Sequence, residues 1–321
     1  MEQEAELVVG TYEDYVVGYR QTESCLEQTF AVRGHSGSVR CLACSPNGTL
    51  ILSAGYDDMV NVFNMKKRKL VCTFEGAVNS ATFVGNSHVV CGSEDGNIYI
   101  YECKQDVILA KTLKGHKAPV ISIDAHPSSK ILLSLSKDGT MRTWNLVKAR
   151  CAYVTRIKNQ AHLVRWSKTG GHFIIAADSE VHLYNNMGRE DHSLKLSKRI
   201  QQVEFLTDNT LTIATDSGIL DIFKTKFDPE TKLSSLEHQY KFEAHDSRIK
   251  SVKCLREIDE KKTTIRLATA ASNGNVKLWS ISTVVEEDET NVGQPKLMAQ
   301  TDTGARLTCM TASVLKSSIV R

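Results

Sequence analysis

Apolar and polar residues alternate in short runs that recur along most of the chain. One unit holds the runs Val39–Cys44, Leu50–Ala54 and Val60–Asn64, with turn residues such as Pro46-Asn47-Gly48 between them. Alternation with a period of two between turn signals predicts antiparallel strands in a meander. A further short run, Thr73-Phe74, adds a fourth strand before the next unit begins. The pattern therefore predicts an all-β chain built from repeated four-stranded units.

The units share a frame that ends in an aromatic residue. Serine or threonine stands ten positions before the aromatic residue in the clearest copies, and Asp or Asn stands six positions before it. A histidine precedes the aromatic residue by 28 positions in two copies and by 34 in a third, where the polar segment Arg256–Thr264 is inserted. Four strands repeated every ~40–45 residues are typical of a β-propeller blade. Complete or partial copies end at Phe63, Tyr101, Trp144, Tyr184, Phe223 and Trp279.

The two ends of the chain together predict a seventh blade. Leu7–Arg20 aligns without gaps to Ile51–Asn64 but lacks a preceding first strand, whereas Ala305–Ser313 resembles a first strand with nothing after it. We expect the terminal strands to pair, because this closure removes exposed sheet edges. The expected blades cover residues of about 34–72, 73–113, 115–156, 160–196, 198–242 and 244–300, and the seventh combines 305–314 with 7–33.

Some of the repeated residues are of the types found in hydrolytic triads, which are recognised by geometry and not by order. Their recurrence at constant spacing favours a structural network instead, in which Asp accepts, a Trp indole donates, and Ser and His lie between them. Because seven blades leave no cluster of non-repeating polar residues, we expect no enzymatic activity. The predicted network residues are His35, Ser53 and Asp57, then His116, Ser134, Asp138 and Trp144, and finally His245, Thr269 and Trp279.

The sequence predicts neither a metal site nor a cofactor. Cys41 and Cys44 lie three apart on a strand, hence on opposite faces, and no second pair follows at ligand spacing. Phosphate-binding glycine motifs and nucleophile elbows are absent from the sequence, so we expect no small-molecule substrate. Nine cysteines without a framework favour a reducing compartment. No run approaches the ~18 apolar residues of a membrane span, so we expect no membrane association.

The net charge of +3 conceals an uneven distribution. Residues 1–30 carry −6 and residues 281–304 carry −4, which leaves +13 on the rest of the chain. Within the acidic stretch, Glu286–Glu289 predicts a solvated loop. The basic run Lys66, Lys67, Arg68 and Lys69 fits a nuclear import signal or a nucleic-acid patch, and equally a solvated turn between strands.

The frame of Gly-His, Ser or Thr, Asp, and Trp-Asn resembles the WD40 repeat family over nearly the whole chain, and so implies a single seven-bladed WD40 β-propeller. Four segments are further similar to the p21-activated-kinase-interacting protein 1-like family. They are Glu6–Arg20, Arg142–Tyr153, Gln160–Trp166 and Ala305–Met310.

This second resemblance implies a scaffold for assembly and rRNA processing of the large (60S) ribosomal subunit in the nucleus and nucleolus. Its partners would be proteins of the pre-60S particle, with rRNA as a further candidate, and the chain would act as a monomer within a larger complex. The resemblance also implies an alternative, since animal members bind and restrain p21-activated kinase.

In WD40 propellers, three positions per blade usually point onto one face, called the top. Here these positions hold seven basic residues and one acidic residue. An electropositive ring suits an acidic peptide or the phosphates of RNA, although rim charges can also merely solubilise a propeller. Two tyrosines could add stacking surface. The predicted partner-binding residues are Arg40, Tyr56, Lys137, Arg165, Arg199, Arg248, Lys250 and Arg306, with Tyr12 as the second aromatic.

Overall fold

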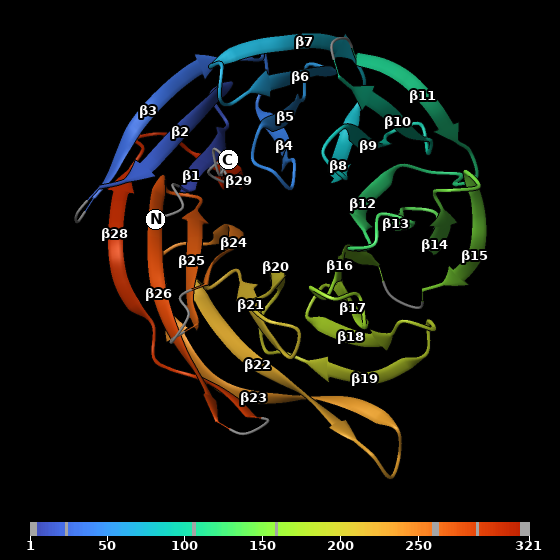
Figure 1. Cartoon of the computed structure of the whole chain (residues 1–321), viewed down its shortest axis with the longest axis vertical. Helices are drawn as coiled ribbons and strands as arrows, with labels where there is room; N and C mark the ends of the chain where they lie inside the picture. The colour runs from blue at the N-terminus through green and yellow to red at the C-terminus, as the bar shows by residue number, and fades with distance from the viewer. Residues whose placement is uncertain are drawn as a thin grey trace, which may run out of the picture.

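The computed structural model describes residues 5–22, 25–104, 107–157, 160–258, 263–286 and 289–314. Every helix-or-strand element in these ranges is a β-strand, and the strands form seven sheets. Figure 1 shows the sheets arranged as blades around a central axis, each following the previous one along the chain. The prediction of an all-β, seven-bladed propeller is confirmed.

In six blades, four or five consecutive strands lie side by side, and the first strand lies innermost (Figure 1). Blade 1 holds β4 (Val39–Cys44), β5 (Leu50–Gly55), β6 (Met59–Asn64) and β7 (Lys69–Glu75). Blade 2 holds β8 (Val78–Val84), β9 (His88–Ser93), β10 (Ile98–Cys103) and β11 (Val107–Leu113). Blade 3 holds β12 (Val120–Ala125), β13 (Ile131–Ser136), β14 (Thr140–Asn145) and β15 (Arg150–Arg156).

The remaining consecutive blades follow the same order. Blade 4 holds β16 (Ala161–Trp166), β17 (His172–Ala177), β18 (Glu180–Asn185) and β19 (Glu190–Lys195). Blade 5 holds β20 (Ile200–Phe205), β21 (Thr210–Thr215), β22 (Ile219–Asp228) and β23 (Leu233–Glu243). Blade 6 holds β24 (Ile249–Ile258), β25 (Thr263–Ala271), β26 (Asn275–Glu286), β27 (Glu289–Val292) and β28 (Lys296–Asp302).

Blade 7 joins the two ends of the chain. Its inner strand is β29 (Leu307–Val314), which pairs antiparallel with β1 (Ala5–Thr11), and β2 (Tyr15–Gln21) and β3 (Leu26–Arg33) complete the sheet. Gly10 allows this blade to approach blade 1, because a Cβ at Gly10 would lie 2.6 Å from Val39 Cγ1. The predicted closure by pairing of the terminal strands is confirmed.

The apolar core is divided among the contacts between blades. Seven clusters of buried residues occur in the described chain, and each joins two adjacent blades. The cluster between blades 2 and 3, for example, packs Val90 and Ile98 against Val120 and Trp144, all at most 1% exposed. Burial of such side chains is worth roughly 1.5–3 kcal/mol each. Apolar burial therefore stabilises every contact between adjacent blades, including the two contacts that blade 7 makes with blades 6 and 1.

Two polar segments of blade 6 extend strands. In the inserted segment Arg256–Thr264, β24 and β25 pair as far as Ile258 opposite Thr263, and residues 259–262 lie outside the described residues. The predicted solvated loop at Glu286–Glu289 is wrong at its ends, because Glu286 of β26 pairs with Glu289 of β27. Residues 287 and 288 lie outside the described residues. Backbone hydrogen bonds between strands do not require apolar side chains. The strands of blade 6 therefore continue into segments of polar sequence.

We define the top face as the one that carries the turns between the second and third strands of each blade. In six blades a backbone N–H in this turn donates to the carbonyl of the residue just before the inner strand. These bonds identify equivalent positions independently of the sequence frame. The donor and acceptor pairs are Tyr56 to Ser38, Glu94 to Ala77, Lys137 to Pro119, Asp216 to Arg199, Ser272 to Arg248, and Tyr12 to Arg306.

Candidate interaction site

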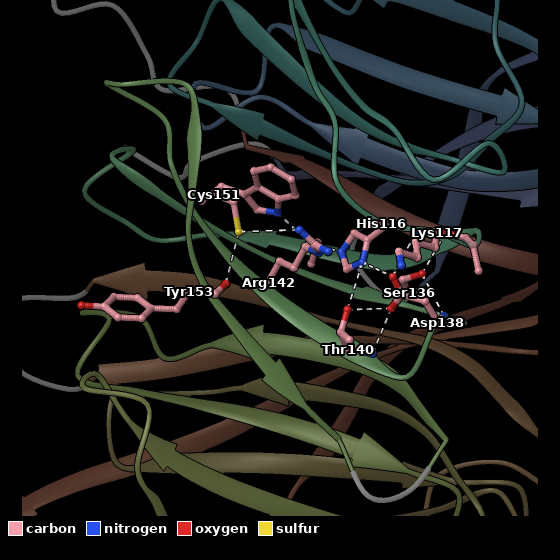
Figure 2. Close-up of polar contacts among 11 residues, drawn as sticks. His116, Lys117, Ser136, Asp138, Thr140, Arg142, Cys151 and Tyr153 are labelled. Carbon is pink, nitrogen blue, oxygen red and sulfur yellow. Dashed lines mark hydrogen bonds and ion pairs between the residues drawn. The ribbon is translucent and has the colours of Figure 1, made fainter.

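The polar network predicted in blade 3 is a continuous chain of hydrogen bonds (Figure 2). The indole Nε1 of Trp144 donates to Ser134 Oγ at 2.8 Å, and Ser134 Oγ lies 2.7 Å from His116 Nε2. His116 Nδ1 lies 2.9 Å from Asp138 Oδ2. A carboxylate can only accept, so Nδ1 of His116 carries the proton and Nε2 accepts from the serine hydroxyl.

Asp138 also holds the turn on the top face. Its carboxylate accepts from the backbone N–H of Lys117 at 3.0 Å and from the hydroxyl of Thr140 at 2.6 Å. Burial alone would raise the pKa of Asp138, but these bonds and the one from His116 outweigh it and hold the pKa well below its usual value. Burial lowers the pKa of His116, against the influence of Asp138. An ionised Asp and a neutral His therefore fit the network at neutral pH.

Blades 1 and 6 carry incomplete forms of this network. In blade 1, His35 contacts both Asp57 and Ser53, but Phe63 stands where blade 3 has a tryptophan. In blade 6, His245 and Trp279 both bond the hydroxyl of Thr269, at 2.8 and 3.0 Å.

The side chain of Ser134 is completely buried, as are those of Ser53 and Thr269. No substrate can reach these hydroxyl groups, so their contacts support a structural role and not a hydrolytic one. The same residue types that form a catalytic triad elsewhere here join strands within one blade.

Two of the predicted top-face cations already have partners on their own face. Arg40 donates to Asn79 Oδ1 at 2.7 Å, lies 3.5 Å from Glu94, and stacks over the ring of Tyr56 at 4.0 Å. Arg199 lies 3.6 Å from Asp178, and both side chains are exposed. Tyr56 remains 63% exposed despite its contact with Arg40.

A hollow of about 860 Å³ opens on the top face between blades 3 and 4. Lys137, Arg199 and His162 lie around it, and Asp178 adds a negative charge. Burial lowers the pKa of His162, and the neighbouring charge of Arg199 lowers it further. The hollow is thus mixed in charge, although Lys137 forms no ion pair among the described residues.

Arg165 does not lie on the top rim. The sequence frame placed it at the position of Arg40, but strand pairing makes His162 the second residue of β16, as Arg40 is of β4. Blade 4 lacks the histidine that anchors the frame, and the alignment slipped by three residues there. Arg165 instead lines a central cavity of about 310 Å³.

Four consecutive inner strands place charges of alternating sign around this cavity. Each charged residue lies four positions after the first residue of its strand, so all four occupy the same level of the ring. The frame of His, Ser and aromatic residues does not reveal this set, whereas an alignment of the inner strands at their first residues does. In order of blade, the residues are Asp124, Arg165, Glu204 and Lys253.

Glu204 is the centre of this set. Its two carboxylate oxygens lie 3.6 Å from Lys168 and 3.7 Å from Lys253. Burial opposes ionisation of Glu204, but Lys253, Lys168 and Arg165 together hold its pKa below the usual value. For Asp124 the balance is reversed, because burial raises the pKa more than the neighbouring cations lower it.

The basic run of blade 1 lies at a turn on the face opposite the top. Lys66, Lys67 and Lys69 are exposed, whereas Arg68 donates to Glu6 at 2.8 Å. Glu6 is only 2% exposed, so this contact neutralises a buried carboxylate. Arg68 therefore joins blade 1 to blade 7, and the three lysines remain accessible.

All nine cysteines lie in the described chain as free thiols. The described residues contain no group of three or more His, Cys, Asp or Glu side chains that could hold a metal ion. A search of the same residues finds no helix that is long and apolar enough to cross a membrane.

The geometry agrees with comparisons with known proteins. The family model described as "WD domain, G-beta repeat" matches residues 25–64, 68–102 and 108–145. A Xenopus laevis protein named p21-activated protein kinase-interacting protein 1-like is 31% identical, over 97% of this chain and 83% of its own. The chain belongs to the p21-activated protein kinase-interacting protein 1-like family. A Homo sapiens protein named p21-activated protein kinase-interacting protein 1 is 30% identical, over 95% of this chain and 76% of its own.

More distant comparisons agree with this family and with its fold. Protein MAK11 of Saccharomyces cerevisiae is 25% identical over 95% of this chain and 82% of its own. A chain in a solved structure titled "Crystal Structure of Mitotic Checkpoint Complex" has a TM-score of 0.70 and 16% identity, covering 85% of this chain and 86% of that one. The likeness to this solved structure shows the fold alone.

Proposed function

We propose that the protein is a non-enzymatic scaffold in nucleolar assembly and rRNA processing of the large ribosomal subunit. The observation that carries this proposal is family membership over 97% of the chain, which includes all seven blades. The resemblance implies nucleolar work for the yeast members, and MAK11 is similar along nearly the same length. The protein would act as one copy within a larger particle.

The mechanism would be positional. A closed ring with a core cluster at each blade contact holds its surface residues at fixed distances, so partners bound to one face are brought together without chemistry. The top face offers exposed cations, Lys137, Arg248 and Arg306 among them, to an acidic partner or to rRNA. Charge attraction of this kind speeds association and weakens as salt is added.

Affinity purification from nuclear extract, with identification of the bound RNA and proteins, tests this function. We expect recovery of large-subunit precursors at about 0.1 M salt and reduced recovery at about 0.4 M, because the Debye length falls from about 10 Å to about 5 Å. Recovery of small-subunit precursors alone, or of no ribosomal RNA, would contradict the proposal.

The names of the vertebrate relatives favour a second function, a negative regulator that binds p21-activated kinase. Purified protein would be mixed with the kinase and its activating GTPase, and kinase activity followed as the GTPase is titrated. A shift of the activation curve to higher GTPase concentration is expected on this alternative. An unchanged curve eliminates it.

Nuclear import through Lys66, Lys67 and Lys69 belongs to the proposal. All three side chains are exposed at one turn. Replacing them by Ala in a fluorescent fusion should shift the protein toward the cytoplasm, whereas the residues of the top face should not affect entry. Arg68 should be left unchanged, since its contact with Glu6 is structural.

A further inference from the structure

Three cationic side chains gather on the top face where blade 6 meets blade 7. Arg248 immediately precedes β24, Lys250 is the second residue of that strand, and Arg306 immediately precedes β29. The two inner strands are neighbours, and Ser251 Oγ of β24 donates to the carbonyl of Met310 in β29 at 3.2 Å. We call Arg248, Lys250 and Arg306 the cationic trio.

The charges of the cationic trio are not balanced by ion pairs within the described part of the chain. None of its side chains forms an ion pair among the described residues. Asp246 accepts from Asn273 at 3.0 Å, and Glu13 accepts from the backbone N–H of Arg306 at 3.4 Å, so neither carboxylate forms an ion pair with a side chain of the trio. Partial burial lowers the pKa of Lys250, and the charges of Arg248 and Arg306 lower it further. Lys250 therefore lies close enough to both arginines to be influenced by their charges.

Positive charge also occurs elsewhere on the top face. Arg40 pairs with Glu94 and Arg199 with Asp178, whereas Lys117 and Lys137 of blade 3 and Lys198 beside Arg199 are exposed. An RNA backbone carries a charge at every nucleotide and needs a row of cations along its path. The exposed lysines elsewhere are spread over other blades, whereas the three cations at the junction of blades 6 and 7 converge on one place and so suit a single compact anion.

We propose that the cationic trio binds the phosphate group of a phosphorylated serine or threonine in a partner protein. A phosphate monoester brings a charge of about −1.5 to −2 and three acceptor oxygens, which match two guanidinium groups and one ammonium group better than one carboxylate does. The ring of Tyr12, 59% exposed and 5.4 Å from the guanidinium of Arg306, offers a surface for the neighbouring peptide residue. The inference rests on the proposed scaffold function and specifies the chemistry of one of its partners.

Fluorescence anisotropy with the full-length protein tests the site. The probes are a labelled peptide Gly-Ser-Glu-pSer-Glu-Gly-Ser, the same peptide without phosphate, and a labelled 20-nucleotide oligouridine. We expect the phosphopeptide to bind at least tenfold more tightly than its unphosphorylated form. The combined change Arg248→Gln, Lys250→Gln and Arg306→Gln should remove this preference.

A matched control removes the same charge from the opposite face, with Lys66→Gln, Lys67→Gln and Lys69→Gln. It should change phosphopeptide binding by less than twofold. If the triple variant of the cationic trio has a lowered melting temperature, Arg248→Gln alone replaces it, since Arg248 is exposed. The site is rejected if phosphate gives no preference, if both variants lose binding equally, or if oligouridine binds more tightly than the phosphopeptide and depends on the trio.

Co-purification of large-subunit precursors is measured on the same proteins. Absence of a phosphate preference in a wild-type protein that still recovers these precursors refutes the phosphate site and leaves the scaffold function standing. A wild-type protein that binds the phosphopeptide but recovers no precursors refutes the ribosomal assignment instead.

Discussion

At the scale of single residues, one hydroxyl group completes the network of blade 3. Ser134 Oγ bonds both Trp144 and His116, and its side chain is fully buried. Leaving a buried donor without a partner costs about 1–3 kcal/mol. The network thus joins the second strand of the blade to the third and to the top-face turn, at a site that water does not reach.

Replacing Ser134 by Ala removes the partner of two buried groups at once. We expect the free energy of unfolding to fall by about 2–4 kcal/mol. Ser53→Ala is the matched change in blade 1, where Phe63 offers no indole, so it should cost clearly less. Urea unfolding of both variants checks the difference, and equal losses would contradict the role given to Trp144.

His245 makes stability depend on pH. Burial, with a further contribution from Lys277, lowers its pKa from 6.5 to about 4. The folded state favours the neutral ring, so the unfolded chain binds a proton first as the pH falls. The contribution of His245 is therefore complete above pH 6.5 and is lost between pH 6.5 and about 4, on the order of 3 kcal/mol in all.

The His245→Gln variant lacks this titration. Unfolding by urea at pH 7.5, 5.5 and 4.5 should show a difference between wild type and variant that shrinks as the pH falls. A difference that stays constant across these values would mean that His245 does not titrate in this range.

At the scale of elements, β29 decides whether the ring is closed. It covers one edge of β1, and its residues Leu307 and Met310 are 1–2% exposed within the cluster that joins blades 6 and 7. Without this strand, β1 would present unpaired backbone groups to solvent, and the blade 7 side of the core would open.

A chain ended after Arg306 should lose cooperative folding. Loss of the burial and pairing of β29 removes on the order of 5 kcal/mol or more, which is comparable with the whole stability of many domains. A chain ended after Val314 keeps the strand and should melt like the full chain. Thermal denaturation followed by circular dichroism measures both, and similar melting of the two would show that closure contributes little.

The repeated frame made the elements and the closure predictable, because the spacing of Ser, Asp and aromatic residues is fixed by strands that pair within one blade. In blade 4 the frame no longer predicts the positions of individual residues. Without the histidine, nothing in the frame distinguishes His162 from Arg165, and only the pairing of β16 with β17 places one on top and the other in the cavity. The meeting of Arg248 and Lys250 with Arg306 likewise depends on the packing of β24 against β29.

At the scale of the whole molecule, the alternating charges inside the ring join four blades. Asp124, Arg165, Glu204 and Lys253 come from consecutive inner strands, so each cation stands between or beside acidic neighbours. Breaking a partly buried pair leaves charges uncompensated. Because the cavity is partly open to water, we expect effects smaller than for a fully buried pair.

Replacing Glu204 and replacing Asp124 should change the free energy of unfolding by different amounts. Glu204→Gln removes the ion-pair partner of Lys168 and Lys253 and should destabilise the protein by about 1–2 kcal/mol. Asp124→Asn should change stability by less than about 1 kcal/mol, since burial already disfavours its charged form and an amide oxygen still accepts from the N–H of Trp166. Guanidinium unfolding compares them, and an equal cost for both would contradict the charge balance described.

The pairing of β1 with β29 also determines when a newly synthesised chain can close its ring. About 300 residues separate the two strands, and at a synthesis rate of roughly 5–20 residues per second β1 waits about 15–60 s for its partner. During that interval the sheet of β1, β2 and β3 has an open inner edge and calls for protection by chaperones. Only a translation product that reaches Val314 can bury that edge, so prematurely ended chains would be left exposed to quality-control proteases.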